Sequence, residues 1–295
     1  MIQSTLTPVS IILRIISSPL SNLFQKQLVN KGIHPLIVNF LTYLAFSFLC
    51  IWPAISVYWL SLPVQFWLYS VLAGLFSACG NGFLIKALEK GELSVLGPIN
   101  AYKPLIGILG GFLLMGEVPG LWGLAGIILI LYGSYFIFDK TENRVSWAII
   151  KRPEIQFRFL ALTLTAIEAV FVRKVTLLSS VTTTTICWCW FGMLFSFFFL
   201  FFFGINPKNE IGKIKFTDSA RLSYLVLSSG IMLVSSIYSL NHIAVGYALS
   251  LFQLSSVGSV LLGYHFFNEK NIRRKLLGSL VMIIGSIMII LSQHD

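Results

Sequence analysis

The sequence KALEKGELSVLGPINAYKPLIGILGGFLLMGE occupies residues 86–117, and a related stretch, SLFQLSSVGSVLLGYHFFNE, occupies residues 250–269. Each stretch is an apolar segment that ends at a glutamate, and each is followed by a second apolar segment with two glycines seven positions apart. Five membrane spans between the two copies would turn the second copy upside down, because five is odd. Inverted repeats of this kind are typical of secondary transporters. The matching residues lie 152 positions apart, Gly111, Glu117, Gly126, Gly133 and Ser134 corresponding to Gly263, Glu269, Gly278, Gly285 and Ser286.

The composition is that of a polytopic membrane protein. Of 295 residues, 56% are hydrophobic and 11% are charged, whereas a soluble domain carries about 25% charged residues. The mean hydropathy is +0.85. The formal net charge of +10 does not indicate nucleic-acid binding, because the basic residues lie between apolar runs instead of gathering on one soluble face. The lipid bilayer is therefore the expected partner.

Reading the apolar runs between charges and prolines predicts an all-α protein with ten transmembrane helices. We expect a first five-helix repeat over residues 1–138, a linker over 139–155 with a short interfacial helix at its WAII sequence, and a second, inverted five-helix repeat over 156–295. Residues 1–9 contain no Lys or Arg, so the first span is expected to be retained and not removed as a signal peptide. The predicted spans are 9–28, 35–57, 64–88, 93–115, 120–138, 156–178, 183–204, 220–243, 246–267 and 272–291.

The basic residues predict an orientation. Nearly all Lys and Arg residues, Arg158 and Lys275 among them, fall in the connections after the first, third, fifth, seventh and ninth spans. The opposite side holds only Arg173 and Lys174. Because positive connections stay in the cytoplasm, both termini are predicted to lie outside an inner (plasma) membrane.

Lys103 is the strongest candidate for a functional residue. It lies near the middle of the fourth predicted span, beside Asn100 and Tyr102 and directly before Pro104. A charge at the bilayer centre is costly, and a proline frees a backbone carbonyl in the preceding turn. We interpret Lys103, Asn100 and Tyr102 as substrate-binding residues at a broken helix; the alternative for Lys103 is a structural ion pair between helices.

Glu168 is the only acidic residue well inside an apolar run. It could pair with Lys103, relay a proton or meet a cationic group of the substrate, since a buried carboxyl can exchange protons near neutral pH. A local interaction with Arg173, about one helical turn away, is equally compatible with the sequence. Protons are accordingly a candidate coupling ion.

The first span has a polar face. Ser18, Asn22 and Gln25 recur at intervals of four and three residues, which places them on one side of a helix, and they are predicted to contact the substrate. Arg14 lies close to the start of the span, so its side chain is expected to reach the membrane surface. Lys26 is predicted to gate the pathway or to anchor the helix at the interface.

The second half offers fewer candidates. Gln253 and Ser255 lie in the ninth span, and Ser255 is the counterpart of Lys103 in the repeat; both are predicted substrate-binding residues. Arg173 takes the gating or anchoring role that Lys26 has in the first half. The four cysteines (Cys50, Cys79, Cys187 and Cys189) all lie in apolar runs and are expected to be packing residues.

Sequence motifs for other functions are absent. The chain has no glycine-rich phosphate loop, no HExxH and no CxxC pair, so no metal, no cofactor and no catalytic residue is predicted. ATP-driven pumping is excluded and an enzyme is disfavoured.

The chain resembles the EamA-type transporters of the drug/metabolite transporter superfamily over essentially its whole length. The resemblance rests on the two stretches quoted above, on GLWGLAGIILILYGSYFI (120–137) and LLGSLVMIIGSIMII (276–290), and on NLFQKQL (22–28) at the end of the first span. It implies a central cavity between two inverted repeats, alternating access, and transport of amino acids, sugar phosphates, nucleotide sugars or drugs. It also implies that Lys103 binds an anionic group, and that both termini lie in the cytoplasm, against the charge count. Some branches of the family carry a second anion-binding lysine in the ninth span, and this sequence has no counterpart of it.

The expected function is that of a secondary transporter, an exporter or exchanger of a small polar metabolite such as an amino acid or related carboxylate, acting as a monomer or homodimer. Two alternatives stay open: an integral membrane enzyme acting on a lipid-linked substrate, and a non-transporting membrane scaffold. The scaffold would have no cavity, so a cavity that reaches Lys103 is the distinguishing observation.

Overall fold

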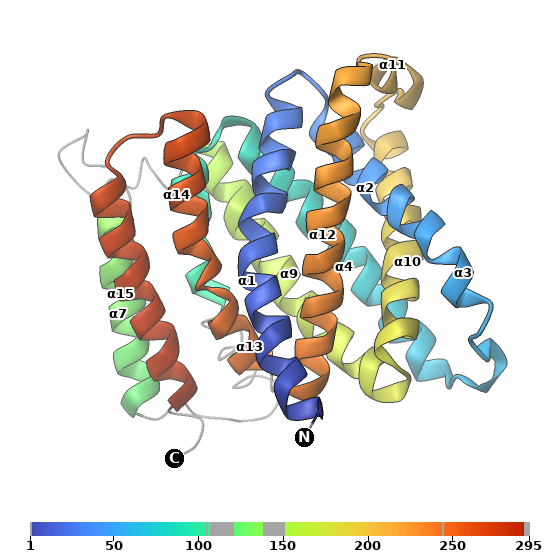
Figure 1. The fold of residues 1–295 in the computed structure, drawn as a ribbon, viewed down its shortest axis with the longest axis horizontal. Helices are drawn as coiled ribbons and strands as arrows, with labels where there is room; N and C mark the ends of the chain where they lie inside the picture. The colour runs from blue at the N-terminus through green and yellow to red at the C-terminus, as the bar shows by residue number, and fades with distance from the viewer. Residues whose placement is uncertain (1, 104–105, 107–120, 138–150, 244, 292–295) are drawn as a thin grey trace.

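The structure, a computed structural model, describes residues 2–103, 106, 121–137, 151–243 and 245–291 (Figure 1). Within these residues the regular elements are all helices, and no strand occurs. Glu117, Pro104 and the interfacial helix predicted at 147–150 lie outside the described residues.

The helices follow the order of the predicted spans. The first half contains α1 (Ile2–Val29), α2 (Pro35–Leu49), α3 (Ile51–Ala54), η1 (Trp59–Ser61), α4 (Val64–Lys90), α5 (Leu93–Leu96), η2 (Pro98–Tyr102) and α7 (Leu121–Ile137). The second half contains α9 (Pro153–Leu178), α10 (Val181–Phe202), α11 (Pro207–Ile211), α12 (Phe216–His242), α13 (Val245–Phe252), α14 (Ser255–Phe267) and α15 (Ile272–Leu291).

Five of the described helices contain a segment long and apolar enough to cross a membrane. These segments are Leu6–Val29, Val64–Lys90, Pro153–Leu178, Val181–Phe202 and Asp218–His242. The chain is therefore a multi-pass membrane protein by the length and composition of its helices.

Two predicted spans are interrupted in the structure. The span predicted at 35–57 is wrong at its end, because α2 stops at Leu49 and only the short α3 follows; Pro53 has no N–H to donate to the carbonyl of Leu49. The span predicted at 246–267 is divided into α13 and α14 by a turn at residues 253–254. The predicted break in the fourth span is found, since α5 is followed by a 3₁₀ segment (η2) directly before Lys103.

The helices pack in pairs that relate the two halves. Helix α1 packs along α12, and α9 packs along α4, the same pairing with the halves exchanged. Helices α7 and α15 form a pair of their own (Figure 1), whereas α10 packs against both α4 and α2. An approximate twofold relation between the halves therefore organises the bundle.

The first helices of the two halves run in opposite directions. Near the start of α1, the hydroxyl of Ser10 lies 2.9 Å from that of Ser239 near the end of α12. Near the end of α9, Nη1 of Arg173 donates to the carbonyl of Ile243, directly after α12, at 2.8 Å. The start of α1 and the end of α9 thus lie on the same face of the molecule.

The repeated glycines lie where α7 meets α15. A Cβ atom on Gly285 would lie 2.6 Å from the carbonyl oxygen of Gly126, and one on Gly133 would lie 2.9 Å from that of Gly278. Small residues permit such close approach of helix backbones. The glycines seven positions apart in each repeat are therefore explained by this contact.

Candidate functional site

A cavity of about 130 Å³ lies among α1, α4, η2, α9, α10, α12 and α13. Its lining mixes polar and charged side chains with apolar ones from both halves of the chain. The polar and charged lining residues are Arg14, Ser18, Ser21, Asn22, Gln25, Asn81, Asn100, Lys103, Arg158, Thr165, Glu168, Trp188 and Ser236. Pockets for drug-sized ligands are usually about 300–1,000 Å³, so this cavity has the size for a smaller solute.

Six of the predicted substrate-binding residues line this cavity. Ser18, Asn22 and Gln25 come from one face of α1, Asn100 and Lys103 come from η2 and its end, and Glu168 comes from α9. Residues separated by more than 140 positions are thereby brought to one chamber, and Lys103 is reached by it. These residues were predicted from two features of the sequence, charges inside predicted spans and polar residues repeated along one helix face.

Tyr102, Gln253 and Ser255 are not among the lining residues. The ring of Tyr102 packs against Phe159, with ring centroids 5.4 Å apart. The side chain of Gln253 donates to the carbonyl of Leu249 at 2.6 Å, and the hydroxyl of Ser255 donates to that of Phe252 at 2.6 Å. Both side chains therefore bond the carbonyls that the break between α13 and α14 leaves available.

Arg14 corrects a prediction. Its side chain lines the cavity instead of reaching the membrane surface, and its guanidinium carbon lies 4.8 Å from the ring centroid of Phe252. Arg14 lies four residues before Ser18, so it shares the polar face of α1. This spacing did not enter the prediction, because Arg14 lies close to the start of the predicted span.

Arg158 and Asn81 are further lining residues that the sequence did not single out. Arg158, counted with the basic connections, is buried inside α9, and its Nε donates to the carbonyl of Leu96 at 2.8 Å. The amide of Asn81 donates to the hydroxyl of Tyr43 at 2.8 Å, and that hydroxyl lies 2.6 Å from the hydroxyl of Ser77. These contacts fix the two side chains at the cavity wall.

Glu168 has a partner that the sequence did not predict. Nε1 of Trp188 donates to Oε1 of Glu168 at 2.6 Å. In the described part of the chain, the ion pairs within 4.0 Å do not include Glu168, Lys103 or Arg14. Glu168 is thus hydrogen-bonded to a neutral side chain, and its charge acts on Lys103 and Arg14 from beyond ion-pair distance.

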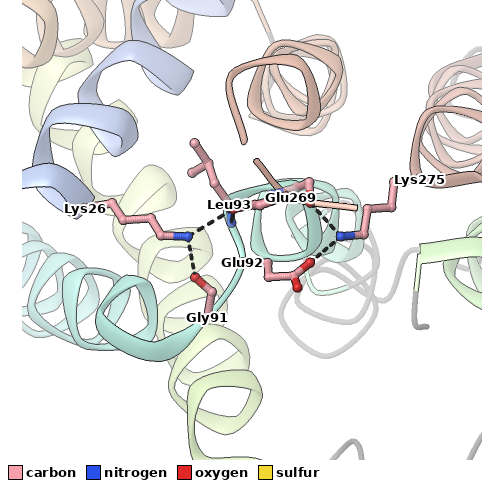
Figure 2. A network of polar contacts seen from close by, with 7 residues as sticks. Lys26, Gly91, Glu92, Leu93, Glu269 and Lys275 are labelled. Carbon is pink, nitrogen blue, oxygen red and sulfur yellow. Dashed lines mark hydrogen bonds and ion pairs between the residues drawn. The ribbon is translucent and has the colours of Figure 1, made fainter. Parts of the chain in front are cut away.

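On the face of the bundle where α1 ends, Lys26, Gly91 and Glu269 form a contact that we call the latch (Figure 2). Nζ of Lys26 lies 3.0 Å from Oε1 of Glu269, donates to the carbonyl of Gly91 at 2.9 Å and lies 4.5 Å from the ring centroid of Phe267. Lys26 and Glu269 are both buried. The latch joins α1, the end of α4 and the turn between α14 and α15.

Glu269 also accepts hydrogen bonds from the first backbone N–H groups of α5. Its two carboxylate oxygens accept hydrogen bonds from the backbone N–H groups of Leu93 at 2.7 Å and Ser94 at 2.8 Å. Burial raises the pKa of the Glu269 carboxyl, but the hydrogen bonds of Ser94 and the charge of Lys26 outweigh it, so the pKa lies below its ordinary value of 4.5. Glu269 is therefore held as the carboxylate.

A second ion pair flanks the latch. Nζ of Lys275, which is buried, contacts the carboxylate of Glu92 and donates to the hydroxyl of Ser94 at 2.8 Å. In Figure 2, Lys26 and Lys275 approach the turn at residues 91–93 from opposite sides. Each lysine thus ties this turn of the first half to the rest of the bundle.

Arg173 makes the counterpart of one latch contact. Its Nη1 donates to the backbone carbonyl of Ile243 at 2.8 Å. Ile243 lies 152 positions after Gly91, which is the spacing of the repeat. Lys26 and Arg173 thus bind equivalent carbonyls at the ends of α4 and α12, on opposite faces. The sequence predicted that the two cations correspond, but not the carbonyls that they bind.

A second hollow, of about 400 Å³, is larger but contains none of the predicted site residues. It is lined mainly by aromatic and aliphatic side chains of α2, α4, α9 and α10, with His34 and Lys86 at its polar part. Among the described residues, no cluster of three or more His, Cys, Asp or Glu side chains could hold a metal ion.

The comparisons with known proteins address the whole chain. No curated protein matches. A solved structure described only as "Crystal structure of protein" matches with a TM-score of 0.68 and 15% identity over 98% of both chains; this likeness extends to the fold alone. The model of the EamA-like transporter family matches twice, at residues 7–139 and 153–291. The chain belongs to the EamA-like transporter family, within the drug/metabolite transporter superfamily.

Proposed function

We propose that this membrane transporter is an exporter or exchanger that moves a small polar metabolite, such as an amino acid or a related carboxylate, across the inner (plasma) membrane. Transport would proceed by alternating access, with ten transmembrane helices forming two inverted five-helix repeats. Lys103, Asn100, Ser18, Asn22, Gln25 and Glu168 would bind the solute.

The cavity between the two halves is the observation that carries this proposal. It is reached by Lys103 and lined by charged, amide and hydroxyl groups from α1, α4, η2 and α9. Polar side chains within a membrane bundle are costly unless they serve a solute or one another. A non-transporting scaffold would have no reason to keep such a chamber.

Alternating access is supported by the cations on the two faces. At one face the latch joins elements of both halves, and at the other Arg173 binds the equivalent carbonyl. A pathway that opens to one side at a time needs contacts that break at one face while they hold at the other. Lys26 and Arg173 therefore suit a gating role.

Glu168 is the proposed proton site. It is the acid that lines the cavity, and Trp188 holds it at 2.6 Å. Exchange of a proton for the solute at one carboxyl would couple the two movements.

The test compares cells expressing the wild-type chain, Lys103→Ala and Lys270→Ala. Lys270 is exposed in the turn after α14, so its variant is the matched loss of a lysine outside the cavity. Small metabolites in medium and cytosol are measured by mass spectrometry at equal protein level in the membrane. We expect wild type and Lys270→Ala to shift the same polar metabolite between the two compartments, and Lys103→Ala to reduce the shift at least about tenfold. The proposal would be wrong if cells expressing the wild-type chain distributed their metabolites as cells without it do.

A further inference from the structure

Three buried polar atoms at the cavity have no hydrogen-bond partner among the described residues. Two are donors, Nε and Nη1 of Arg14, and one is an acceptor, Oε1 of Gln25. Gln25 is 6% exposed and lines the cavity. Buried polar groups in proteins almost always form hydrogen bonds. Unbonded donors and acceptors that line a cavity therefore indicate which acceptors and donors a ligand would supply.

Arg14 is presented to the chamber by local structure. Arg14, Ser18 and Asn22 follow each other at intervals of four along α1 and share one helix face. The guanidinium lies over the ring of Phe252 from α13, at 4.8 Å from the ring centroid. A ring on one face of the guanidinium limits its rotation and leaves the N–H edge available.

The charges of the chamber favour an anion. Three cations, Arg14, Lys103 and Arg158, line it with one acid, Glu168. Arg158 already donates to the carbonyl of Leu96. Within the described part of the chain, Arg14 and Lys103 form no ion pair within 4.0 Å, although the charge of Glu168 attracts both. Burying more cations than anions is costly, and a carboxylate accepts strong, charge-assisted hydrogen bonds from guanidinium N–H groups.

We infer that Arg14 binds the carboxylate of the transported solute, and that Gln25 and Glu168 accept hydrogen bonds from a donor group on the same solute. The ligand class is a small carboxylic acid that also carries an amino or hydroxyl group. This inference rests on the proposed function and assigns the anion to Arg14, with Lys103 adding charge to the same chamber.

Binding to purified protein in detergent tests this assignment. The probes are the common L-amino acids and, as matched controls, their C-terminal amides, which lack only the anionic carboxylate. The shift of the unfolding midpoint is measured for wild type, Arg14→Gln, Arg14→Lys and Arg152→Gln. Arg152 is exposed at the start of α9, away from the cavity, so it controls for the same substitution elsewhere.

At least one amino acid should raise the midpoint of the wild type and of Arg152→Gln, while its amide should not. Arg14→Gln should weaken that binding about ten- to hundredfold, and Arg14→Lys should fall between, because it keeps the charge and loses the planar fork. Arg14→Lys also serves if Arg14→Gln does not fold.

Three results would overturn the assignment: equal binding of acid and amide, undiminished binding by both Arg14 variants, or no midpoint shift with any amino acid. A wild-type chain that still redistributes a metabolite in cells would then keep the proposed function, with a solute of another class. If neither the midpoint shift nor the metabolite redistribution were seen, both the assignment and the proposed function would be wrong.

Discussion

Gly263 gives the latch the space that it needs. A Cβ atom at this position would lie 2.5 Å from Oε2 of Glu269, so the carboxylate folds back over the bare backbone of α14. Asn268, with φ 53°, ends that helix in the left-handed conformation that turns the chain toward Glu269. The spacing of Gly111 to Glu117 in the first repeat is the same, so the pattern that defined the duplication has a steric cause at Gly263.

Reversing one charge of the latch should destabilise the protein, and reversing both should restore part of the loss. Lys26→Glu or Glu269→Lys leaves a buried charge without its partner, which costs about 3–5 kcal/mol in comparable pairs. The free energy of unfolding in detergent gives the measurement.

The pair Lys213–Glu210 is the control, since Lys213 is exposed and Lys213→Ala should change stability little. If Lys26→Glu were as mild as this control, the latch would not be a stabilising contact.

The latch should hold at neutral pH and weaken in acid. Because the pKa of Glu269 in the folded chain lies below its ordinary 4.5, its contribution to stability is present above that value and is lost as the pH falls through the folded pKa. Wild type and Glu269→Gln should therefore differ in unfolding midpoint at pH 7 and converge as the pH falls below about 4.5. A difference that stays constant with pH would contradict this account.

At the scale of whole helices, the backbones of α7 and α15 approach closely at the repeated glycines. A Cβ atom added at Gly285 would meet the carbonyl oxygen of Gly126, and it would lie 2.9 Å from the side chain of Ile130. The backbone cannot yield as a flexible side chain can. These two helices should thus separate if either glycine gains a side chain.

Gly285→Ala should lower the free energy of unfolding by about 1–3 kcal/mol through overpacking. Gly230→Ala is the matched control, because its Cβ would meet only the ring of Phe46 at 3.4 Å. Thermal unfolding of both variants decides: equal midpoints would mean that α7 and α15 adjust to the added methyl group without cost.

The sequence predicted the helical class, the duplication and six of the lining residues, because intramembrane charge and helical periodicity are local signals. It did not predict where the second and ninth spans break. At the break at residues 253–254, the side chains of Gln253 and Ser255 bond backbone carbonyls of α13. The position of Arg14 in the cavity was not predicted, because its contact with Phe252 joins residues that are far apart in the sequence.

At the scale of the molecule, the bundle is asymmetric in charge along its axis. The start of α1 and the end of α15 lie on one side, and α11 with the turn before α12 lies on the other (Figure 1). That second side includes Lys208, Lys213 and Lys215, which are exposed or partly exposed. From the positive-inside rule we expect this side to face the cytoplasm.

Fusions at the C-terminus should therefore report an extracytoplasmic end. Alkaline phosphatase attached after Asp295 should be active, and green fluorescent protein at the same point should be dark. The reverse result would place both termini in the cytoplasm, as the family resemblance implies, and would mean that the lysine count does not determine insertion here.

Trp188 gives the chamber an optical reporter of its own. Its indole donates to the carboxylate of Glu168 in the wall of the cavity. A bound molecule or an added proton that loosens this hydrogen bond should therefore change the polarity around the ring. The difference between the fluorescence spectra of wild type and Trp188→Phe isolates the emission of Trp188, which is one of seven tryptophans. Occupancy and coupling could then be followed in unlabelled protein, in real time, from the same chromophore.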